Sequence, residues 1–227
     1  MQQDPGSVRP VAEAMTAVSH EPVVRHLGLA DYLATWNAMR SFAEQRTPAD
    51  ADEIWLLQHP PVYTLGFNAK HAPFPVPPGV ALVQTDRGGD ITYHGPGQLV
   101  AYVLCDLRRR GWGPKGLVHA LEQSIIDTFT GYAITGRRRT GAPGVYVGDR
   151  KIAQLGLRIR RGTSYHGISL NVDMDLGPFD RIDPCGYPGL EVTQIAEFVS
   201  QPDVGAVENA LLDALMGNLR YNERHHA

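Results

Sequence analysis

The chain reads Arg87-Gly-Gly-Asp-Ile-Thr-Tyr-His-Gly-Pro-Gly-Gln98 immediately before an apolar run at residues 99–104. The glycines allow backbone amides to approach a ligand closely, and an arginine, a tyrosine and a histidine within eight residues offer polar anchors. No Gly-x-x-x-x-Gly-Lys-Ser/Thr motif for phosphate binding occurs in the chain. A dinucleotide fingerprint is also excluded, because Val100 stands where its third glycine should be. The segment therefore indicates either a ligand-binding wall beside a strand or an ordinary tight turn.

The segments on both sides of residues 87–98 predict strands in runs, with a few helices between them. Asp31 precedes a helical apolar pattern that extends to about residue 46, and it is placed to cap that helix. Pro114 begins a second helix, and a Gly148-Asp149 turn indicates a hairpin over residues 145–160. Runs of strands, rather than regular alternation with helices, predict an α+β fold with mixed or antiparallel sheets and flanking helices. Further strands are expected at residues 23–27, 53–58, 62–65, 80–83, 98–107 and 163–172, and a closing helix at residues 204–220.

The length of 227 residues suits one domain with a sizeable core. Apolar residues make up 43% of the chain and charged residues 20%, as in ordinary globular proteins. We expect residues 1–21 to form a poorly ordered extension, because they show no sustained periodicity. Residues 22–220 are expected to form the single domain and residues 221–227 a tail.

The formal net charge of −3 gives no basic field of the kind that binds nucleic acid. No apolar run approaches the roughly 20 residues needed to span a bilayer. The first residues lack the basic start and apolar core of a secretory signal. We therefore expect a cytoplasmic protein, a monomer without nucleic-acid or membrane partners.

Lys151 lies on a predicted strand, where alternation places it on one face with Ala153 and the apolar residues at every second position up to Ile159. Gln154 is expected to point the other way. A lysine on an apolar face loses hydration, which favours the neutral amine and allows it to accept or deliver a proton near neutral pH. The alternative is a lysine at the end of a strand that reaches water along its stem.

The two cysteines have different surroundings. Cys105 alternates with Leu99, Ala101 and Val103, which predicts a small, inert core residue. Cys185 stands in the irregular segment Asp183-Pro-Cys-Gly-Tyr-Pro-Gly189, where a thiol can meet a substrate and a nearby positive group would stabilise its thiolate. Taken alone, this segment leaves a reactive and an unreactive thiol equally open.

The other histidines and the arginine runs are most simply predicted to have structural positions. His166 shares a predicted strand face with Ile168 and Leu170, which favours a core histidine unless that face lines a pocket. No pair of histidines has metal-ligand spacing with a cysteine or carboxylate, so we expect no metal. The arginine runs at residues 108–110 and 137–139 indicate solvated loops or, alternatively, docking of an acidic partner.

Three motifs, taken in order, resemble those of the lipoyl(octanoyl) transferases, which share a fold group with lipoate and biotin protein ligases. The first is residues 87–98. The second runs from Gly141 through Lys151-Ile-Ala-Gln-Leu-Gly156 to residues 165–171, and the third spans residues 179–193 and contains Pro184-Cys-Gly186. The similarity covers about residues 22–220 and implies a fold like the catalytic domain of biotin and lipoate protein ligases.

The resemblance implies a reaction and its partners. Octanoyl would be taken from octanoyl-acyl carrier protein and placed on a lysine of a lipoyl domain, as the first step of protein lipoylation. The implied acceptors are the lipoyl domains of 2-oxoacid dehydrogenase complexes and the glycine cleavage H protein. No cofactor is implied, neither ATP nor a metal, because a thioester stores the energy for amide formation.

The resemblance also implies site residues. By motif position, Cys185 matches the catalytic nucleophile and Lys151 matches the lysine that lowers the pKa of that thiol. Gln154 stands where serine or alanine is usual, and Ile168-Ser169 replaces a common Leu-Ala, which affects the detail of the pocket and not the reaction class. The residues that match substrate-binding segments are Arg87, Gly88, Gly89, Asp90, Ile91, Thr92, Tyr93, His94, Gln154, Leu155, Gly156, His166, Gly167, Ile168 and Ser169.

Three other functions are also compatible with the sequence. An ATP-dependent lipoate ligase of the same fold would need a nucleotide site and no catalytic cysteine. A binding module for lipoyl domains or acyl carrier protein would not need Cys185 and Lys151 together. A cysteine hydrolase would release free octanoate faster than it transfers the acyl group.

Overall fold

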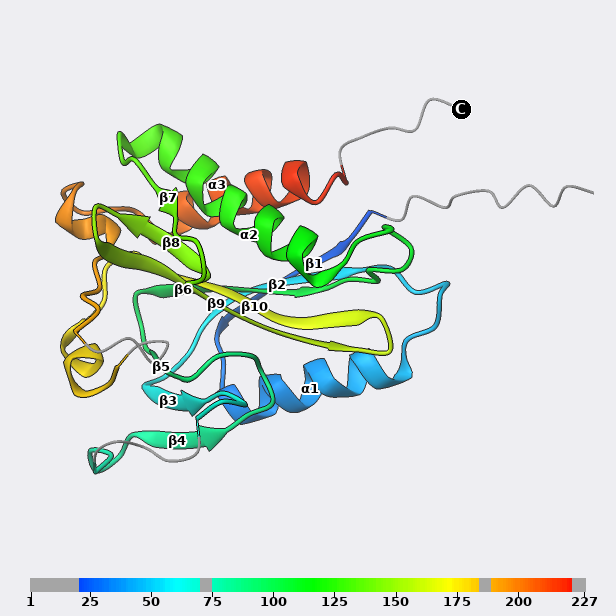
Figure 1. Cartoon of the computed structure of the whole chain (residues 1–227), viewed down its shortest axis with the longest axis horizontal. Coiled ribbons are helices and arrows are strands. Elements are labelled where there is room, and N and C mark those ends of the chain that lie inside the picture. Colours follow the sequence, from blue (N-terminus) through cyan, green and yellow to red (C-terminus); the bar gives the residue numbers. More distant parts are fainter. Residues whose placement is uncertain (1–20, 70–74, 184–188, 222–227) are drawn as a thin grey trace, which may run out of the picture.

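The computed structural model describes residues 21–69, 75–183 and 189–221. The predicted N-terminal extension and C-terminal tail therefore lie almost wholly outside the described residues. Within the described residues, the strands form one sheet of seven and one of three. Helices α2 (Pro114–Thr128) and α3 (Val204–Asn218) cover one face of the larger sheet, and α1 (Tyr32–Gln45) lies on the other face with the smaller sheet (Figure 1). These layers confirm the predicted α+β class.

The strand order explains how distant motifs meet. The strands are β1 (Val23–Leu29), β2 (Glu53–Gln58), β3 (Val62–Leu65), β4 (Ala81–Gln84), β5 (Ile91–His94), β6 (Gln98–Leu104), β7 (Arg137–Arg138), β8 (Gly144–Val147), β9 (Arg150–Arg160) and β10 (Thr163–Asn171). The larger sheet has the order β1-β2-β6-β10-β9-β8-β7 and the smaller β4-β3-β5. Only the β1–β2 and β3–β4 pairs are parallel among the described strands. The second motif therefore crosses the centre of the larger sheet on β9 and β10.

Several predicted elements are confirmed by their local chemistry. The Asp31 carboxylate accepts a hydrogen bond from the Ala34 backbone amide at 2.8 Å and begins α1. Pro114 occupies the first turn of α2, where its missing amide hydrogen costs no helical bond. Residues 148–149 turn the chain from β8 into β9. The short strands β5 and β7 were not predicted, because β5 lies within the glycine-rich segment and β7 has only two residues.

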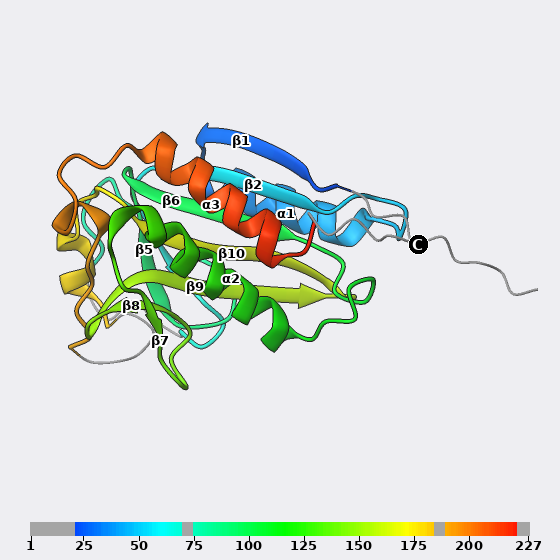
Figure 2. The ribbon, with the colours of Figure 1, turned by 90° about the horizontal axis from the view of Figure 1, so that it is seen from above.

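Two apolar cores lie on opposite faces of the larger sheet. The first fills the space between the sheet and helices α2 and α3, which run side by side across it (Figure 2). It contains the predicted inward residues Leu99, Ala101, Val103 and Cys105. The second lies under α1 and includes Met39 from that helix. A third core belongs to the smaller sheet. Among the described residues, no helix has the length and apolar character needed to span a membrane.

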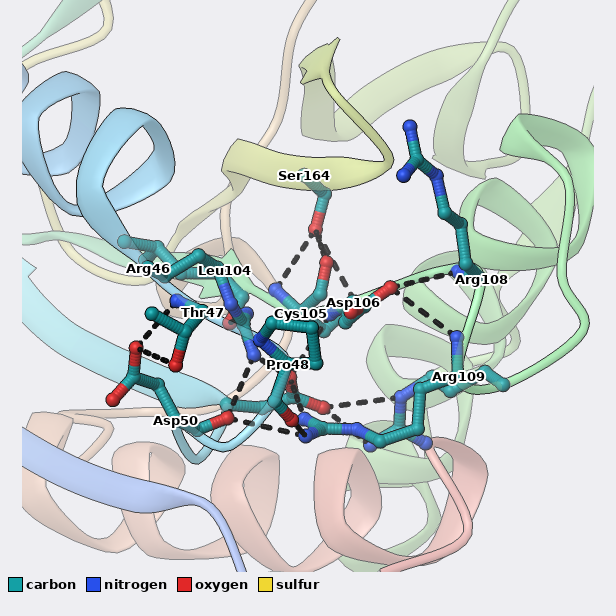
Figure 3. Close-up of polar contacts among 12 residues, drawn as sticks. Arg46, Thr47, Pro48, Asp50, Leu104, Cys105, Asp106, Arg108, Arg109 and Ser164 are labelled. Atoms are coloured by element: carbon teal, nitrogen blue, oxygen red, sulfur yellow. Dashed lines mark hydrogen bonds and ion pairs between the residues drawn. The ribbon is translucent and has the colours of Figure 1, made fainter.

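Cys105 is a core residue, as predicted. Its side chain is fully buried and its sulfur lies 3.2 Å from the Ser164 hydroxyl oxygen, at the strand end shown in Figure 3. Burial raises the pKa of the Cys105 thiol to about 11. This thiol is therefore protonated at neutral pH and unsuited to nucleophilic chemistry.

Asp52 organises the basic residues at the same end of the sheet. Its buried carboxylate accepts from Arg46 at 3.0 Å, Arg109 at 2.5 Å and Arg110 at 3.0 Å. Burial raises the pKa of Asp52, but the Asp106 backbone amide and the neighbouring guanidinium groups lower it by more, so the net pKa lies below that of an ordinary aspartate. The expectation that residues 108–110 form a solvated loop was wrong for Arg110, because the guanidinium of this residue forms an ion pair with the buried Asp52 carboxylate.

The second arginine run is also internally paired. Arg138 contacts the Glu122 carboxylate at 3.2 Å, and Arg137 and Arg139 contact Asp149 at 2.7 and 3.0 Å. Much of the charge that the sequence offered for docking an acidic partner is thus engaged within the chain.

We predict that Asp52→Asn lowers the free energy of unfolding by about 3–5 kcal/mol at pH 7, because it leaves buried guanidinium groups without their carboxylate. Since the folded-state pKa of Asp52 lies below the unfolded value, its contribution is present above about pH 4 and is lost as the pH falls through the folded-state pKa. Urea unfolding at pH 7 and at lower pH values measures both effects. The matched control is Asp149→Asn, whose carboxylate is 86% exposed and should cost less than about 1 kcal/mol. Equal losses in the two variants would contradict the central role of Asp52.

Candidate functional site

A pocket lies where the smaller sheet meets β6, β9 and β10 of the larger sheet. It encloses about 470 Å³ of space free of protein atoms, including its opening to solvent. All the predicted substrate-binding residues line it except Gly88 and Tyr93. Its lining consists of Tyr32, Arg87, Gly89, Asp90, Ile91, Thr92, His94, Val100, Tyr102, Gln154, Leu155, Gly156, His166, Gly167, Ile168 and Ser169. The first two motifs therefore form one concave site, as ligand pockets usually are.

The two exceptions have structural positions. The Gly88 backbone amide donates to the Leu157 carbonyl at 2.8 Å and joins the glycine-rich segment to β9. Tyr93 packs in the core of the smaller sheet, with its ring centroid 5.1 Å from that of Tyr63 and 5.8 Å from that of Phe179. Both residues support the pocket wall from behind.

Three lining residues were not predicted: Tyr32, Val100 and Tyr102. Tyr102 and Val100 alternate with the core residues of β6, so period-two alternation could have placed them on the opposite face. Tyr32 is the first residue of α1, and no local pattern distinguishes it from an ordinary core tyrosine.

Arg87 anchors the glycine-rich segment. Its guanidinium is buried and donates to the Thr64 carbonyl at 2.7 Å, to the Thr64 hydroxyl at 2.9 Å and to the Gly88 carbonyl at 3.1 Å. These bonds tie the segment to β3 of the smaller sheet. A fixed positive charge thus stands in the pocket wall.

His166 reaches the pocket because of its backbone conformation. Its φ is +60°, a left-handed conformation that non-glycine residues rarely adopt. The strand-face prediction that grouped it with Ile168 was wrong, since Ile168 packs in the core under α2 and α3. The His166 ring instead stacks on Tyr165 with centroids 5.1 Å apart and lies 6.0 Å from the ring of Tyr102. The left-handed residue turns the imidazole to the pocket side.

Asp86 holds the His166 ring in place. Its carboxylate lies 3.2 Å from His166 Nε2 and also accepts from the Tyr165 hydroxyl and from the Trp36 indole, the latter at 3.0 Å. Burial lowers the pKa of His166 despite the nearby carboxylate. Burial raises the pKa of Asp86, but the hydrogen bonds from His166, Tyr165 and Trp36 lower it by more. The pair is therefore a neutral imidazole that donates to a carboxylate.

Lys151 faces the opposite way from its predicted face. Tyr146 on β8 pairs with Lys151 on β9. The preceding residue, Val145, pairs with Ala153, so Ile152 is an extra residue that forms a β-bulge. Val145, Ile152 and Ala153 all pack in the core under α2 and α3. Because cross-strand partners share a face, Lys151 and Tyr146 lie on the other face of the sheet, toward the pocket.

Gly144 makes room for the Lys151 side chain. It pairs with Gln154 on β9, has a φ of +128°, and a Cβ atom there would lie 2.5 Å from Lys151 Cε and 3.1 Å from Nζ. The Gly144 amide donates to the Glu122 carboxylate at 2.9 Å. Lys151 is fully buried, and its Nζ donates to the Pro143 carbonyl at 2.8 Å and lies 5.4 Å from the centroid of the Tyr146 ring. The amine is thus seated over Gly144 on the pocket-facing side.

The third motif joins the second through the backbone of Lys151. The Lys151 amide donates to the Glu191 carbonyl at 2.9 Å, and the Thr193 amide donates to the Lys151 carbonyl at 2.9 Å. These bonds form a parallel bridge between Lys151 and Val192. Residues 189–193, the C-terminal end of the third motif, are therefore attached beside the lysine. Cys185 lies in residues 184–188, outside the described residues.

A chain of side-chain amides continues from this bridge to the glycine-rich segment. Asn171 donates to the Thr193 carbonyl at 2.9 Å, and Gln98 donates to the Asn171 side chain at 2.9 Å. The Gln98 oxygen lies 2.7 Å from His94 Nδ1. Burial lowers the pKa of His94 well below its usual value. All three motifs thus meet through buried hydrogen bonds that strongly favour one arrangement.

The described residues contain no group of three or more histidine, cysteine, aspartate or glutamate side chains able to hold a metal ion. What they present is an apolar pocket, a neutral imidazole and several fixed hydrogen-bond donors in its wall, and a buried amine that does not line the pocket but lies on the same face of β9 as Gln154. Such an arrangement suits an acyl chain and proton transfer near its carbonyl end.

Comparison with known families agrees with this geometry. Residues 31–216 match the family of the lipoyl protein ligase A/B catalytic domain. An octanoyltransferase of Laribacter hongkongensis is 54% identical over 192 residues, which cover 85% of this chain and 93% of the relative. An octanoyltransferase of Thiobacillus denitrificans is 55% identical over 193 residues, covering 85% and 88% of the two chains.

Solved structures agree on the fold. A lipoate-protein ligase A bound with ATP has a TM-score of 0.72 at 17% identity, covering 88% of this chain and 86% of that one. The apo biotin protein ligase of Aquifex aeolicus has a TM-score of 0.53 at 12% identity, covering 88% and 70%. The predicted ligase-like fold is confirmed.

Proposed function

The chain belongs to the lipoyl protein ligase A/B catalytic-domain family and is an octanoyltransferase of protein lipoylation, and from that premise we propose that the octanoyl group passes through a thioester on Cys185 with Lys151 as its proton partner. The observation that supports this route most is the position of the Lys151 side chain and backbone. Its amine is buried on the pocket-facing side of β9, and its backbone is bonded to the C-terminal end of the motif that contains Cys185. A buried amine beside a thiol favours the thiolate that a nucleophile requires.

The first half-reaction loads the enzyme. Lys151 takes the proton of the Cys185 thiol, and the thiolate attacks the thioester carbon of octanoyl-acyl carrier protein. A carbon–sulfur bond to Cys185 forms while the carbon–sulfur bond to the carrier breaks. The departing carrier thiolate takes the proton from the Lys151 ammonium, which returns the amine to its neutral form.

The second half-reaction forms the amide. The neutral amine of a lysine on a lipoyl domain attacks the octanoyl carbonyl, and the bond to Cys185 breaks as the carbon–nitrogen bond forms. Lys151 relays the released proton to the Cys185 sulfur. The acyl-enzyme thioester supplies the driving force, so we propose that neither ATP nor a metal takes part.

The pocket holds the octanoyl chain in this proposal. Each buried methylene contributes about 0.8 kcal/mol, so seven carbons beyond the carbonyl supply roughly 5 kcal/mol of binding free energy. Adding or removing one methylene changes binding only modestly, so some tolerance of chain length follows. The segments at residues 87–94, 154–156 and 166–169 form the substrate-binding walls.

The partners follow from the two half-reactions. Acyl carrier protein is the donor, and lipoyl domains of 2-oxoacid dehydrogenase complexes and the glycine cleavage H protein are the acceptors. We place this reaction in the cytoplasm, within one catalytic domain at residues 22–220.

We predict that transfer from octanoyl-acyl carrier protein to an apo lipoyl domain proceeds without ATP and falls to background in Cys185→Ser, because an alcohol lacks the acidity of the thiol. Cys105→Ser is the matched control and should keep the native rate, since Cys105 is buried in the core. Mass spectrometry of the lipoyl domain measures the product. Transfer that requires ATP and survives Cys185→Ser would favour a ligase instead.

We also predict that Gly144→Ala lowers the transfer rate at least about 100-fold, in the range lost when a general acid–base group is misplaced. The added methyl group would lie 2.5 Å from Lys151 Cε and 2.5 Å from the Ala153 carbonyl oxygen, so it would displace the amine and also crowd the backbone of β9. Gly148→Ala on the same hairpin is the control, because it also has a positive φ but a Cβ atom there meets nothing within 4 Å. Thermal unfolding of both variants separates backbone strain from loss of the amine. A native transfer rate in Gly144→Ala would show that the position of the Lys151 amine does not matter for the reaction.

A further inference from the structure

Gln154 leaves a buried hydrogen-bond donor unused in the pocket wall. Its side chain is 5% exposed, and its Nε2 atom is buried and has no partner in the part of the chain that the structure describes. An unpaired buried amide destabilises the folded protein, because it has lost its hydrogen bonds to water without replacing them. A group that comes with the substrate can recover this cost, which points to an acceptor in the bound ligand.

The orientation of the Gln154 carboxamide is fixed from one side. The Ser169 hydroxyl on β10 donates to Gln154 Oε1 at 2.9 Å. The two residues are also direct cross-strand partners of β9 and β10. This contact uses the oxygen end of the carboxamide, so its nitrogen end is the one left to bind a ligand.

The position of Gln154 places this donor on the same side of the sheet as the Lys151 amine. Gln154 pairs with Gly144 on β8, and cross-strand partners share a face. The Lys151 amine occupies that same face directly over Gly144, at 3.1 Å from the position of its missing Cβ atom. The Gln154 side chain and the Lys151 amine therefore lie on the same face of β9, on either side of Gly144 in the pairing.

The octanoyl group offers a single strong acceptor, its carbonyl oxygen, because the remaining carbons form an aliphatic chain. We propose that Gln154 Nε2 donates to this oxygen and stabilises the negative charge that it carries when sulfur or nitrogen attacks the carbonyl carbon. This inference rests on the proposed transfer reaction and adds a residue to it. As the new bond forms, an electron pair moves onto the oxygen, and it returns when the old carbon–sulfur bond breaks. Gln154 transfers no proton in either step.

The test compares native protein with Gln154→Met, which keeps the length of the side chain and removes the donor. Rapid quenching of the full chain with saturating octanoyl-acyl carrier protein, followed by intact mass, gives the rate constant for acyl-enzyme formation. We expect a decrease of about 100-fold, as for the loss of one oxyanion donor, with little change in the donor concentration for half-saturation. Gln123→Met on α2 is the matched control and should keep the native rate constant.

A spectroscopic measurement separates this role from mere pocket shape. Infrared difference spectra of the acyl-enzyme made with octanoyl labelled with ¹³C at the carbonyl report the hydrogen bond directly. We expect the carbonyl band to shift to higher frequency in Gln154→Met. Should that variant fail to fold in thermal unfolding, Gln154→Asn withdraws the carboxamide by one methylene and should give the same upward shift.

The outcomes distinguish this inference from the function on which it rests. Absence of any octanoyl adduct on the native chain would overturn the acyl-enzyme route itself. A native adduct with unchanged loading rate and carbonyl band in a folded Gln154 variant would overturn the role of Gln154 alone. An altered preference for acyl-chain length, without a change in either quantity, would assign Gln154 to pocket depth and equally overturn it.

Discussion

At Lys151, strand β9 has a paired neighbour on each edge, and the arrangement of the site depends on this constraint. On one edge β9 pairs with β8, and on the other Lys151 exchanges two hydrogen bonds with the carbonyl of Glu191 and the amide of Thr193. A backbone held on two sides leaves the side chain little freedom to turn. The bulge at Ile152 then determines which face receives the amine, and Gly144 provides the space for it.

Local sequence patterns were sufficient for much of the fold and for the location of the site. The cap at Asp31, the turn at residues 148–149 and the buried position of Cys105 follow from chemistry within a few residues. Strand alternation predicted the wrong face for Lys151 and for His166, because the backbone is irregular at both places. A β-bulge at Ile152 directly follows Lys151, and His166 itself has a left-handed backbone conformation. Such irregularities are common near functional sites because they redirect a side chain. Neither the register that creates the bulge nor the contacts of His166 with Tyr102 and Asp86 can be predicted from nearby residues.

Buried side-chain amides differ between the scaffold and the pocket wall in whether their hydrogen bonds are satisfied. Along the path from His94 through Gln98 and Asn171 to Thr193, each side-chain amide has a partner, and the network joins three distant segments. Such satisfied networks rigidify a protein and favour one arrangement over others. Gln154 differs, because one end of its carboxamide is bound by Ser169 and the other has no partner in the described structure. The contrast locates the place where the substrate is expected to complete the hydrogen bonding.

The central claim is that the octanoyl group rests on Cys185 between donor and acceptor. The most direct test digests the native chain after brief mixing with octanoyl-acyl carrier protein, under conditions that preserve thioesters, and locates the added mass by peptide sequencing. We expect one octanoyl group, found on the peptide that contains Cys185 and released when an apo lipoyl domain is added. An octanoyl group on Cys105 or Lys151, or an adduct that the lipoyl domain does not discharge, would contradict it.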